Sequence, residues 1–169
     1  MGKTILVTGA AGFIGSHTAQ LLASRGDKVI GLDNLNDYYD PAQKRANLEE
    51  VRQVLTQQGQ ADAFSFVEGD IRDQKVVAEL FATYSFDAIV HLAAMAGVRV
   101  SIENPHMYYD VNVLGTLNLL DAAVGRITRE GKLDTLPTFV FASTSSAVSY
   151  THLRAHETDS YLVCRLLLE

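Results

Sequence analysis

Three glycines spaced three residues apart, Gly9, Gly12 and Gly15, follow an apolar run at residues 4–7 and lead into a helical segment at Phe13–Ser24. A turn that brings backbone amides against a pyrophosphate needs residues without a Cβ where the phosphate and the neighbouring strand come close. The free N–H groups of the following helix carry about half a positive charge toward the anion. The pattern predicts a strand, turn and helix that bind a dinucleotide, although the same glycines could form an ordinary tight turn.

An acidic residue, Asp33, ends the next apolar run at a spacing from the glycines that suits a ribose contact. Its carboxylate would accept hydrogen bonds from the adenosine ribose and repel the 2′-phosphate of NADP, so NAD is the expected cofactor. Alternatively, Asp33 only caps the loop at residues 33–36. Asp70 follows the third apolar run on the same edge of the predicted sheet, but taken alone it could be a turn residue.

The elements that must position these residues are apolar runs alternating with segments of helical periodicity, which is typical of parallel βαβ units. Strands are expected at residues 4–7, 28–32, 63–67, 86–92 and 138–142, each almost uniformly apolar, as in a sheet with both faces covered. The predicted fold class is therefore α/β, a Rossmann-type doubly wound parallel sheet of which five strands are visible.

Capping residues predict where the helices begin and end. Gly26 can close the first helix, Asp73 can start the third, and Asp40 and Asn104 each precede a proline at the first helical position. The core-facing stripe of the helix after Pro41 is expected at Leu48, Val51 and Leu55.

The composition restricts the possible partners. The 169 residues, of which 47% are hydrophobic, suit one globular domain, and the net charge of −6 provides no basic face for nucleic acid. A single cysteine, Cys164, excludes a disulfide framework and a cysteine-rich zinc site. No apolar run approaches the roughly 18 residues of a membrane span, and residues 4–7 are too short for a signal peptide. We expect a cytoplasmic protein that binds neither nucleic acid nor membrane.

Several further segments together resemble one family. They are Asp33-Asn34, residues 37–40 (DYYD), Gly69-Asp70-Ile71, residues 91–94 (HLAA), Asn112 and residues 142–146 (ASTSS). With the glycines, over about residues 3–146, they resemble the NAD-dependent sugar-nucleotide epimerases of the extended short-chain dehydrogenase/reductase superfamily. Residues 32–40 and 96–105 look most like UDP-glucuronate 4-epimerases. A related dehydratase or reductase, and a non-catalytic NAD-binding module, remain alternatives.

This resemblance implies roles in binding the cofactor. The pyrophosphate loop would comprise Gly9, Gly12, Phe13, Ile14 and Gly15. The adenosine would be contacted by Asp33, Asn34, Asp70 and Ile71. The nicotinamide ribose would lie along Leu92, Ala93, Ala94 and Ala96, with support from Asn112 and Ser143. Asn112 could instead be a polar residue facing water.

The resemblance also implies a catalytic residue and substrate contacts. Thr144 would hydrogen-bond the sugar hydroxyl that is oxidised, unless residues 143–146 are only a solvated loop. Arg99 and Ser101 could reach a uronate carboxylate, although a solvent-facing arginine is the commoner outcome. Dehydratases usually carry an acidic residue directly after the active-site threonine, where this chain has Ser145, and this favours an epimerase.

In the chemistry of the family a tyrosinate takes the proton of the sugar 4-hydroxyl while hydride passes to NAD, and the ketone then receives the hydride on its other face. A phenol with a pKa of about 10 can do this near pH 7 only beside positive charge, normally a lysine four residues on. Tyr150 and Tyr161 are followed instead by Arg154 and Arg165, so the pair is not matched. We expect the chain as given to bind NAD weakly without turnover, and its parent to be a homodimer acting on a UDP-hexuronate or UDP-hexose.

Residues 147–169 depart from the alternating pattern. They show no clear period and resemble translated adapter sequence, so we expect a truncated NAD-binding domain at residues 1–146 followed by a non-native tail. His152, His156 and Glu157 in the tail lack the H-E-x-x-H order and a third ligand, which favours an incidental cluster over a metal site.

Overall fold

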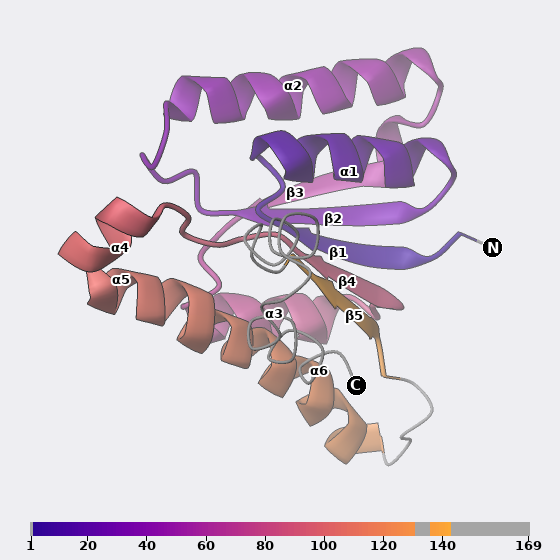
Figure 1. Ribbon diagram of the computed structural model, residues 1–169. Helices are drawn as coiled ribbons and strands as arrows, with labels where there is room; N and C mark the ends of the chain where they lie inside the picture. The colour runs from indigo at the N-terminus through magenta and orange to yellow at the C-terminus, as the bar shows by residue number, and fades with distance from the viewer. Residues whose placement is uncertain (1, 131–135, 143–169) are drawn as a thin grey trace, which may run out of the picture.

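A computed structural model of the protein, which describes residues 2–130 and 136–142, contains one parallel sheet with helices on both faces (Figure 1). The strands are β1 (Thr4–Thr8), β2 (Lys28–Asp33), β3 (Phe64–Glu68), β4 (Ala88–His91) and β5 (Thr138–Phe141). They lie in the order β3-β2-β1-β4-β5, and every neighbouring pair is parallel. The predicted α/β class and its five strands are confirmed; β4 alone is clearly shorter than expected.

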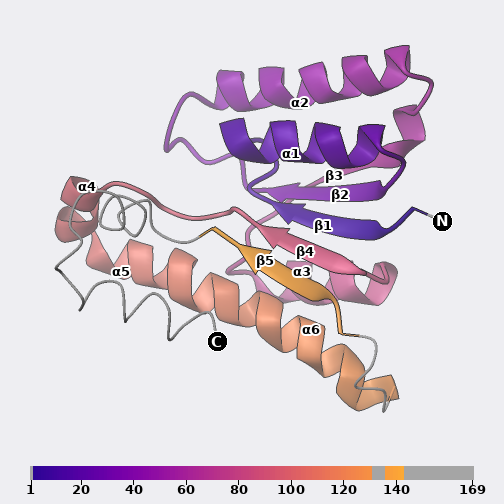
Figure 2. The ribbon, with the colours of Figure 1, turned by 45° about the vertical axis from the view of Figure 1, so that its right-hand side comes forward.

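Two layers of helices cover the sheet. On one face lie α1 (Phe13–Ser24) and α2 (Pro41–Gln57), and on the other α3 (Gln74–Thr83) and α6 (Thr116–Glu130) (Figures 1 and 2). Side chains that alternate along β1 point into two separate cores: Val7 packs in the first core with α1 and α2, whereas Leu6 packs in the second core with α3 and α6. This burial on both faces explains why the strand sequences are apolar throughout.

Shorter helical segments connect the main elements. The 3-10 turn η1 (Ala61–Ala63) leads into β3. After β4 come α4 (Val98–Glu103), α5 (Pro105–Tyr109) and the π-helical turn η2 (Asp110–Gly115), which continues directly into α6. The sequence predicted one helix start at Pro105 but gave no indication of the π-helical turn.

Most of the predicted caps are confirmed. The carboxylate of Asp40 accepts from the Ala42 amide at 2.9 Å, that of Asp73 accepts from the Lys75 amide at 2.9 Å, and Gly26 has φ +95°. Asn104 is the N-cap of α5 with Pro105 at the first helical position, as predicted, but its side chain makes no capping hydrogen bond. Asn104 also ends α4, and its ψ of 58° differs from the extended backbone that lets an N-cap side chain reach the next turn.

The predicted core stripe of α2 is also confirmed, since Leu48, Val51 and Leu55 are all buried. Within the described ranges, none of the helices is long and apolar enough to cross a bilayer. The expected boundary near Ala147 and the tail that follows lie outside the described residues, as do the expected site residues Ser143, Thr144 and Ser145.

Candidate cofactor-binding site

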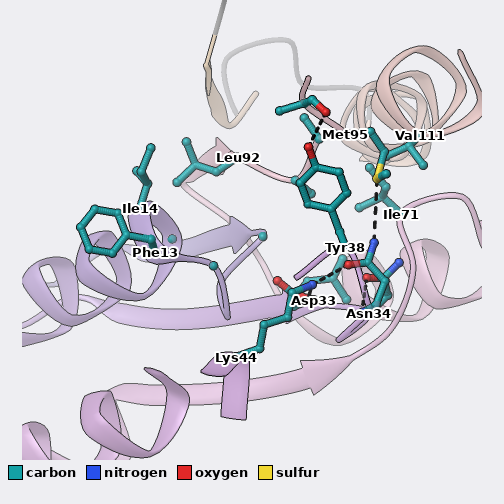
Figure 3. A pocket seen from close by; sticks show the side chains of 18 of the residues that line it. Phe13, Ile14, Asp33, Asn34, Tyr38, Lys44, Ile71, Leu92, Met95 and Val111 are labelled. Carbon is teal, nitrogen blue, oxygen red and sulfur yellow. Dashed lines mark hydrogen bonds and ion pairs between the residues drawn. The ribbon is translucent and has the colours of Figure 1, made fainter. Parts of the chain in front are cut away.

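A cavity of about 360 Å³ opens at the carboxyl ends of the strands (Figure 3). It extends from the loop after β3, across the β1–α1 turn, to the loop after β4. The chain order reverses between β1 and β4, and this is the point at which open α/β sheets bind ligands. The predicted cofactor residues that line it are Gly9, Gly12, Phe13, Ile14, Gly15, Asp33, Asn34, Asp70, Ile71, Leu92, Ala93, Ala94 and Ala96.

The β1–α1 turn is packed too tightly for side chains. Gly9 has φ +70°, and a Cβ there would lie 2.8 Å from the Ala93 amide nitrogen at the end of β4. A Cβ at Gly15 would overlap the carbonyl of Gly9. Gly12 is the N-cap of α1, and as a glycine it brings no capping side chain of its own to the first-turn amides of the helix. These amides are the groups that hold an anion at a helix N-terminus.

Asp33 lines the cavity and also shapes the loop that follows β2. Its Oδ2 accepts from the Ala11 amide at 3.2 Å, and its Oδ1 accepts from the Leu35 amide at 2.9 Å. The two expectations for Asp33, a ligand contact and a loop cap, are therefore geometrically compatible.

Lys44 is a cavity residue that the sequence interpretation missed. Its Nζ lies 3.5 Å from Oδ1 of Asp33, donates to Oδ1 of Asn36 at 2.6 Å, and sits 5.3 Å from the centroid of the Tyr39 ring. Lys44 stands four residues before Leu48 on the buried stripe of α2. A lysine at a core position was therefore the sequence feature that could have identified it as a site residue. Its ammonium offsets the charge with which Asp33 was expected to repel a 2′-phosphate.

Asp70 is held by hydrogen bonds from the loop after β2 and from its own loop after β3. It accepts from Asn34 Nδ2 at 2.8 Å and from the Arg72 side chain at 2.7 and 3.0 Å. Partial burial alone would raise the pKa of Asp70, but the hydrogen bonds and charge of Arg72, with Asn34, lower it to about 2. Asp70 is therefore an ionised, fixed acceptor at the rim of the cavity near Asn34.

Asn112 supports the wall of the cavity on the β4 side. This residue does not itself line the cavity; its Oδ1 accepts from the Met95 amide at 2.8 Å and its Nδ2 donates to the Met95 carbonyl at 2.9 Å. The hydroxyls of Tyr38 and Tyr108 both donate to the carbonyl of Ala96. The remaining lining residues that were not singled out as site residues are Leu32, Asn36, Tyr38, Tyr39, Met95, Val111 and Ala142.

Two expected substrate residues, Arg99 and Ser101, do not line the cavity. Arg99 is exposed on α4, and Ser101 on the same helix donates to the Val98 carbonyl at 2.7 Å.

Ala142, directly before Ser143, lines the cavity at the end of β5. In residues 2–130 and 136–142, no three metal-ligating side chains gather into a group that could hold an ion.

Comparison with known proteins shows the family of this chain. Residues 6–157 match the family described as GDP-mannose 4,6 dehydratase. UDP-glucuronate 4-epimerase 4 of Arabidopsis thaliana is 46% identical over 145 residues, which cover 86% of this chain and 30% of that protein.

Two solved structures are similar in both sequence and fold. UDP-glucose 4-epimerase from Brucella ovis, in complex with NAD, has 37% identity and a TM-score of 0.62, covering 86% of this chain and 37% of that one. DesIV, a dTDP-glucose 4,6-dehydratase from Streptomyces venezuelae with NAD and TYD bound, has 41% identity and a TM-score of 0.59. The match covers 72% of this chain and 36% of that one. This chain spans about a third of the length of these relatives. It belongs to the GDP-mannose 4,6-dehydratase family of short-chain dehydrogenase/reductase domains, among NAD-dependent sugar-nucleotide epimerases and dehydratases.

Proposed function

We propose that this chain is the NAD-binding part of a cytoplasmic UDP-sugar 4-epimerase, whose substrate is UDP-glucuronate and whose product is UDP-galacturonate. The observation that carries the proposal is the cavity that joins the β1–α1 glycine turn to Asp33, Asp70 and the loop after β4. The choice of sugar is supported by the 46% identity to a UDP-glucuronate 4-epimerase.

The lining residues fit NAD in an extended pose. Asp70 and Ile71 would hold the adenine, Asp33 its ribose, the α1 N-terminus the pyrophosphate, and Leu92–Ala96 the nicotinamide ribose. The missing side chain at Gly15 lets the first turn of α1 pack against the Gly9 carbonyl, and a Cβ at Gly12 would lie 3.0 Å from the hydroxyl of Tyr39, another lining residue. When bound, NAD would accept a hydride from the sugar C4 and return it.

We assign the substrate contacts to residues near the end of β5. Thr144 would hydrogen-bond the sugar hydroxyl, with Ser143 beside the cofactor and Ser145 beside the sugar. Arg99 and Ser101 would contact the uronate only if α4 turned toward the cavity. The tyrosine that acts as base and the lysine that stabilises its anion are not matched in this chain, and we therefore propose NAD binding without turnover.

A dehydratase parent is the second candidate. It is supported by the description of the matching family and by the 41% identity to DesIV. Ser145, at a place where dehydratases usually carry an acidic residue, favours the epimerase.

Binding of NADH and NADPH to the purified chain, measured by nicotinamide fluorescence, tests the cofactor assignment. We expect NADH to bind more tightly, and tighter binding of NADPH would overturn the ribose assignment for Asp33. Incubation with UDP-glucuronate and NAD is expected to give no UDP-galacturonate. The full-length parent should contain Y-x-x-x-K and form that product, whereas a 4-keto-6-deoxy sugar from a UDP-hexose would identify a dehydratase.

We also propose that the parent assembles as a homodimer through one helical face. Large apolar side chains at Tyr109, Val113, Leu117, Leu120 and Val124 are each 39–55% exposed and recur every three or four residues along α5, η2 and α6. Such a stripe is typical of helix pairing across a two-fold axis, where the same surface of each copy meets. We call these five residues the α6 stripe.

A further inference from the structure

His91, the last residue of β4, is a buried histidine with a hydrogen bond at each ring nitrogen. Its Nδ1 lies 2.7 Å from Oγ1 of Thr8 at the end of β1, and its Nε2 lies 2.9 Å from Oγ1 of Thr116 at the start of α6. The residue is 5% exposed, and none of these three residues lines the cavity.

The partners fix the direction of each hydrogen bond. The Thr116 hydroxyl lies 2.7 Å from the carbonyl of Asn112, which can only accept, so the Thr116 hydrogen is directed there. His91 Nε2 must then donate to Thr116. Thr8 Oγ1 already accepts from the amides of Leu92 and Ala93, each at 3.2 Å, and so donates its own hydrogen to His91 Nδ1. A neutral ring protonated at Nε2 satisfies every partner.

Both ends of the cavity wall depend on this chain of hydrogen bonds. At one end, Thr8 holds the amides of Leu92 and Ala93. At the other end, the Thr116 hydroxyl donates to the carbonyl of Asn112. The Asn112 side chain in turn hydrogen-bonds both the amide and the carbonyl of Met95. His91 links the two ends, which otherwise belong to different elements.

We propose that His91 is a positioning residue that, through Thr8 and Thr116, fixes residues Leu92–Met95 as the support for the nicotinamide half of the dinucleotide. This inference rests on the proposed NAD site. The adenine half would lie over β2 and β3, at Asp33 and Asp70, on the opposite side of β1 from His91. Loss of the hydrogen bonds through His91 should therefore weaken binding of the nicotinamide half of the cofactor more than binding of the adenine half.

The environment of the ring keeps His91 neutral near pH 7. Burial lowers the pKa of His91 to about 4, and the ring also packs against Phe139 of β5 at 5.9 Å between centroids. A charged ring would donate from Nδ1 as well, toward a Thr8 oxygen that two amides already occupy.

The test uses the whole chain with two probes, NADH and ADP, and the substitution Thr116→Val, which removes the hydroxyl but keeps the shape. Thr56→Val is the matched control, because the Thr56 hydroxyl makes the same bond to the carbonyl four residues earlier, 2.7 Å to Arg52, on an exposed part of α2. Thr116→Val should weaken NADH binding by about tenfold, because His91 Nε2 loses its acceptor in addition to the bond that Thr116 donates to Asn112, and leave ADP binding unchanged. Thr56→Val should change neither, and Thr116→Ser should restore NADH binding.

Each other outcome counts against the proposal. Unchanged NADH affinity in Thr116→Val, or equal weakening of NADH and ADP, would overturn the positioning role while leaving the proposed NAD site intact. A wild-type chain that binds neither probe would overturn the NAD site and this inference with it. Thr116→Ala replaces Thr116→Val if the valine variant does not fold, with the same expected separation between the two probes.

Discussion

Lys44 and Asp33 form an ion pair inside the protein: Nζ lies 3.5 Å from Oδ1, and the side chains are only 6% and 7% exposed. The carboxylate also accepts two backbone amides, while the ammonium donates to Asn36 and lies over the Tyr39 ring. The pair thereby joins the start of α2 to the loop after β2 and to the glycine turn.

Replacing Lys44 by methionine should destabilise the fold by about 3 kcal/mol, because the Asp33 carboxylate would remain buried without its cation. Urea unfolding monitored by circular dichroism measures the loss. Arg52→Met on the same helix is the control, since the exposed Arg52 side chain pairs with the exposed Glu49 at 4.0 Å and its loss should change stability by less than about 0.5 kcal/mol. Equal stability of the two variants would show that the buried pair contributes little.

Gly9→Ala should cost more stability than Gly59→Ala, although the two glycines have nearly the same φ of +70° and +71°. The left-handed conformation alone costs about 1–2 kcal/mol for alanine. At Gly59 a Cβ meets nothing within 4 Å, whereas at Gly9 it would lie 2.8 Å from the Ala93 nitrogen and force β1 and β4 apart. Denaturant midpoints of the two variants should therefore differ, and matching midpoints would contradict the close approach seen at Gly9.

The stability of the protein should depend on pH through His91. Its folded pKa of about 4 lies below the ordinary 6.5, so between these values the unfolded chain binds the extra proton. The contribution is complete above pH 6.5 and declines by about 3 kcal/mol as the pH falls to 4. As the pH is lowered from 7 to 4.5, the unfolding free energy should fall more steeply for the wild type than for His91→Phe, and parallel profiles would refute the shift.

The α6 stripe should control the oligomeric state if the homodimer proposal is right. Val113→Glu with Leu117→Glu would place charges in the middle of an apolar contact and should convert a dimer to a monomer in sedimentation velocity. Leu21→Glu on α1 changes a side chain that is 70% exposed outside the stripe and should leave the dimer intact. A monomeric wild-type chain at all concentrations would count against the stripe as a dimer contact for this chain.

Local signals explain what the sequence predicted well. The apolar strands, the bounds of α1 and the caps at Asp40 and Asp73 depend on a few neighbouring residues, and the structure contains all of them. The glycine turn with Asp33 and Asp70 was predictable because parallel strands bring their carboxyl ends to one edge of the sheet. The missing side-chain cap at Asn104 shows the limit, since its conformation is set by the end of α4 as well as by the start of α5.

Features that depend on tertiary contacts were missed. Lys44 has the spacing of a core residue, but its partner Asp33 is positioned by β2 and is recognisable only once α2 is packed. In the sequence, His91 is simply a histidine at the end of an apolar run. Its hydrogen-bond partners could not be recognised, because Thr8 and Thr116 lie 83 and 25 residues away in the chain. The π-helical turn before α6 also had no local signal.

The central place of β1 in the sheet determines the order in which the molecule can assemble on the ribosome. Its first neighbour, β2, is made soon after it, but its second, β4, must wait until Ala88–His91 has emerged, and such distant pairings slow folding. Until then one edge of β1 stays unpaired and Gly9 lacks the backbone of Leu92 and Ala93 beside it. The cavity lining is therefore complete only after the fourth strand has docked, because Leu92–Ala96 follow that strand.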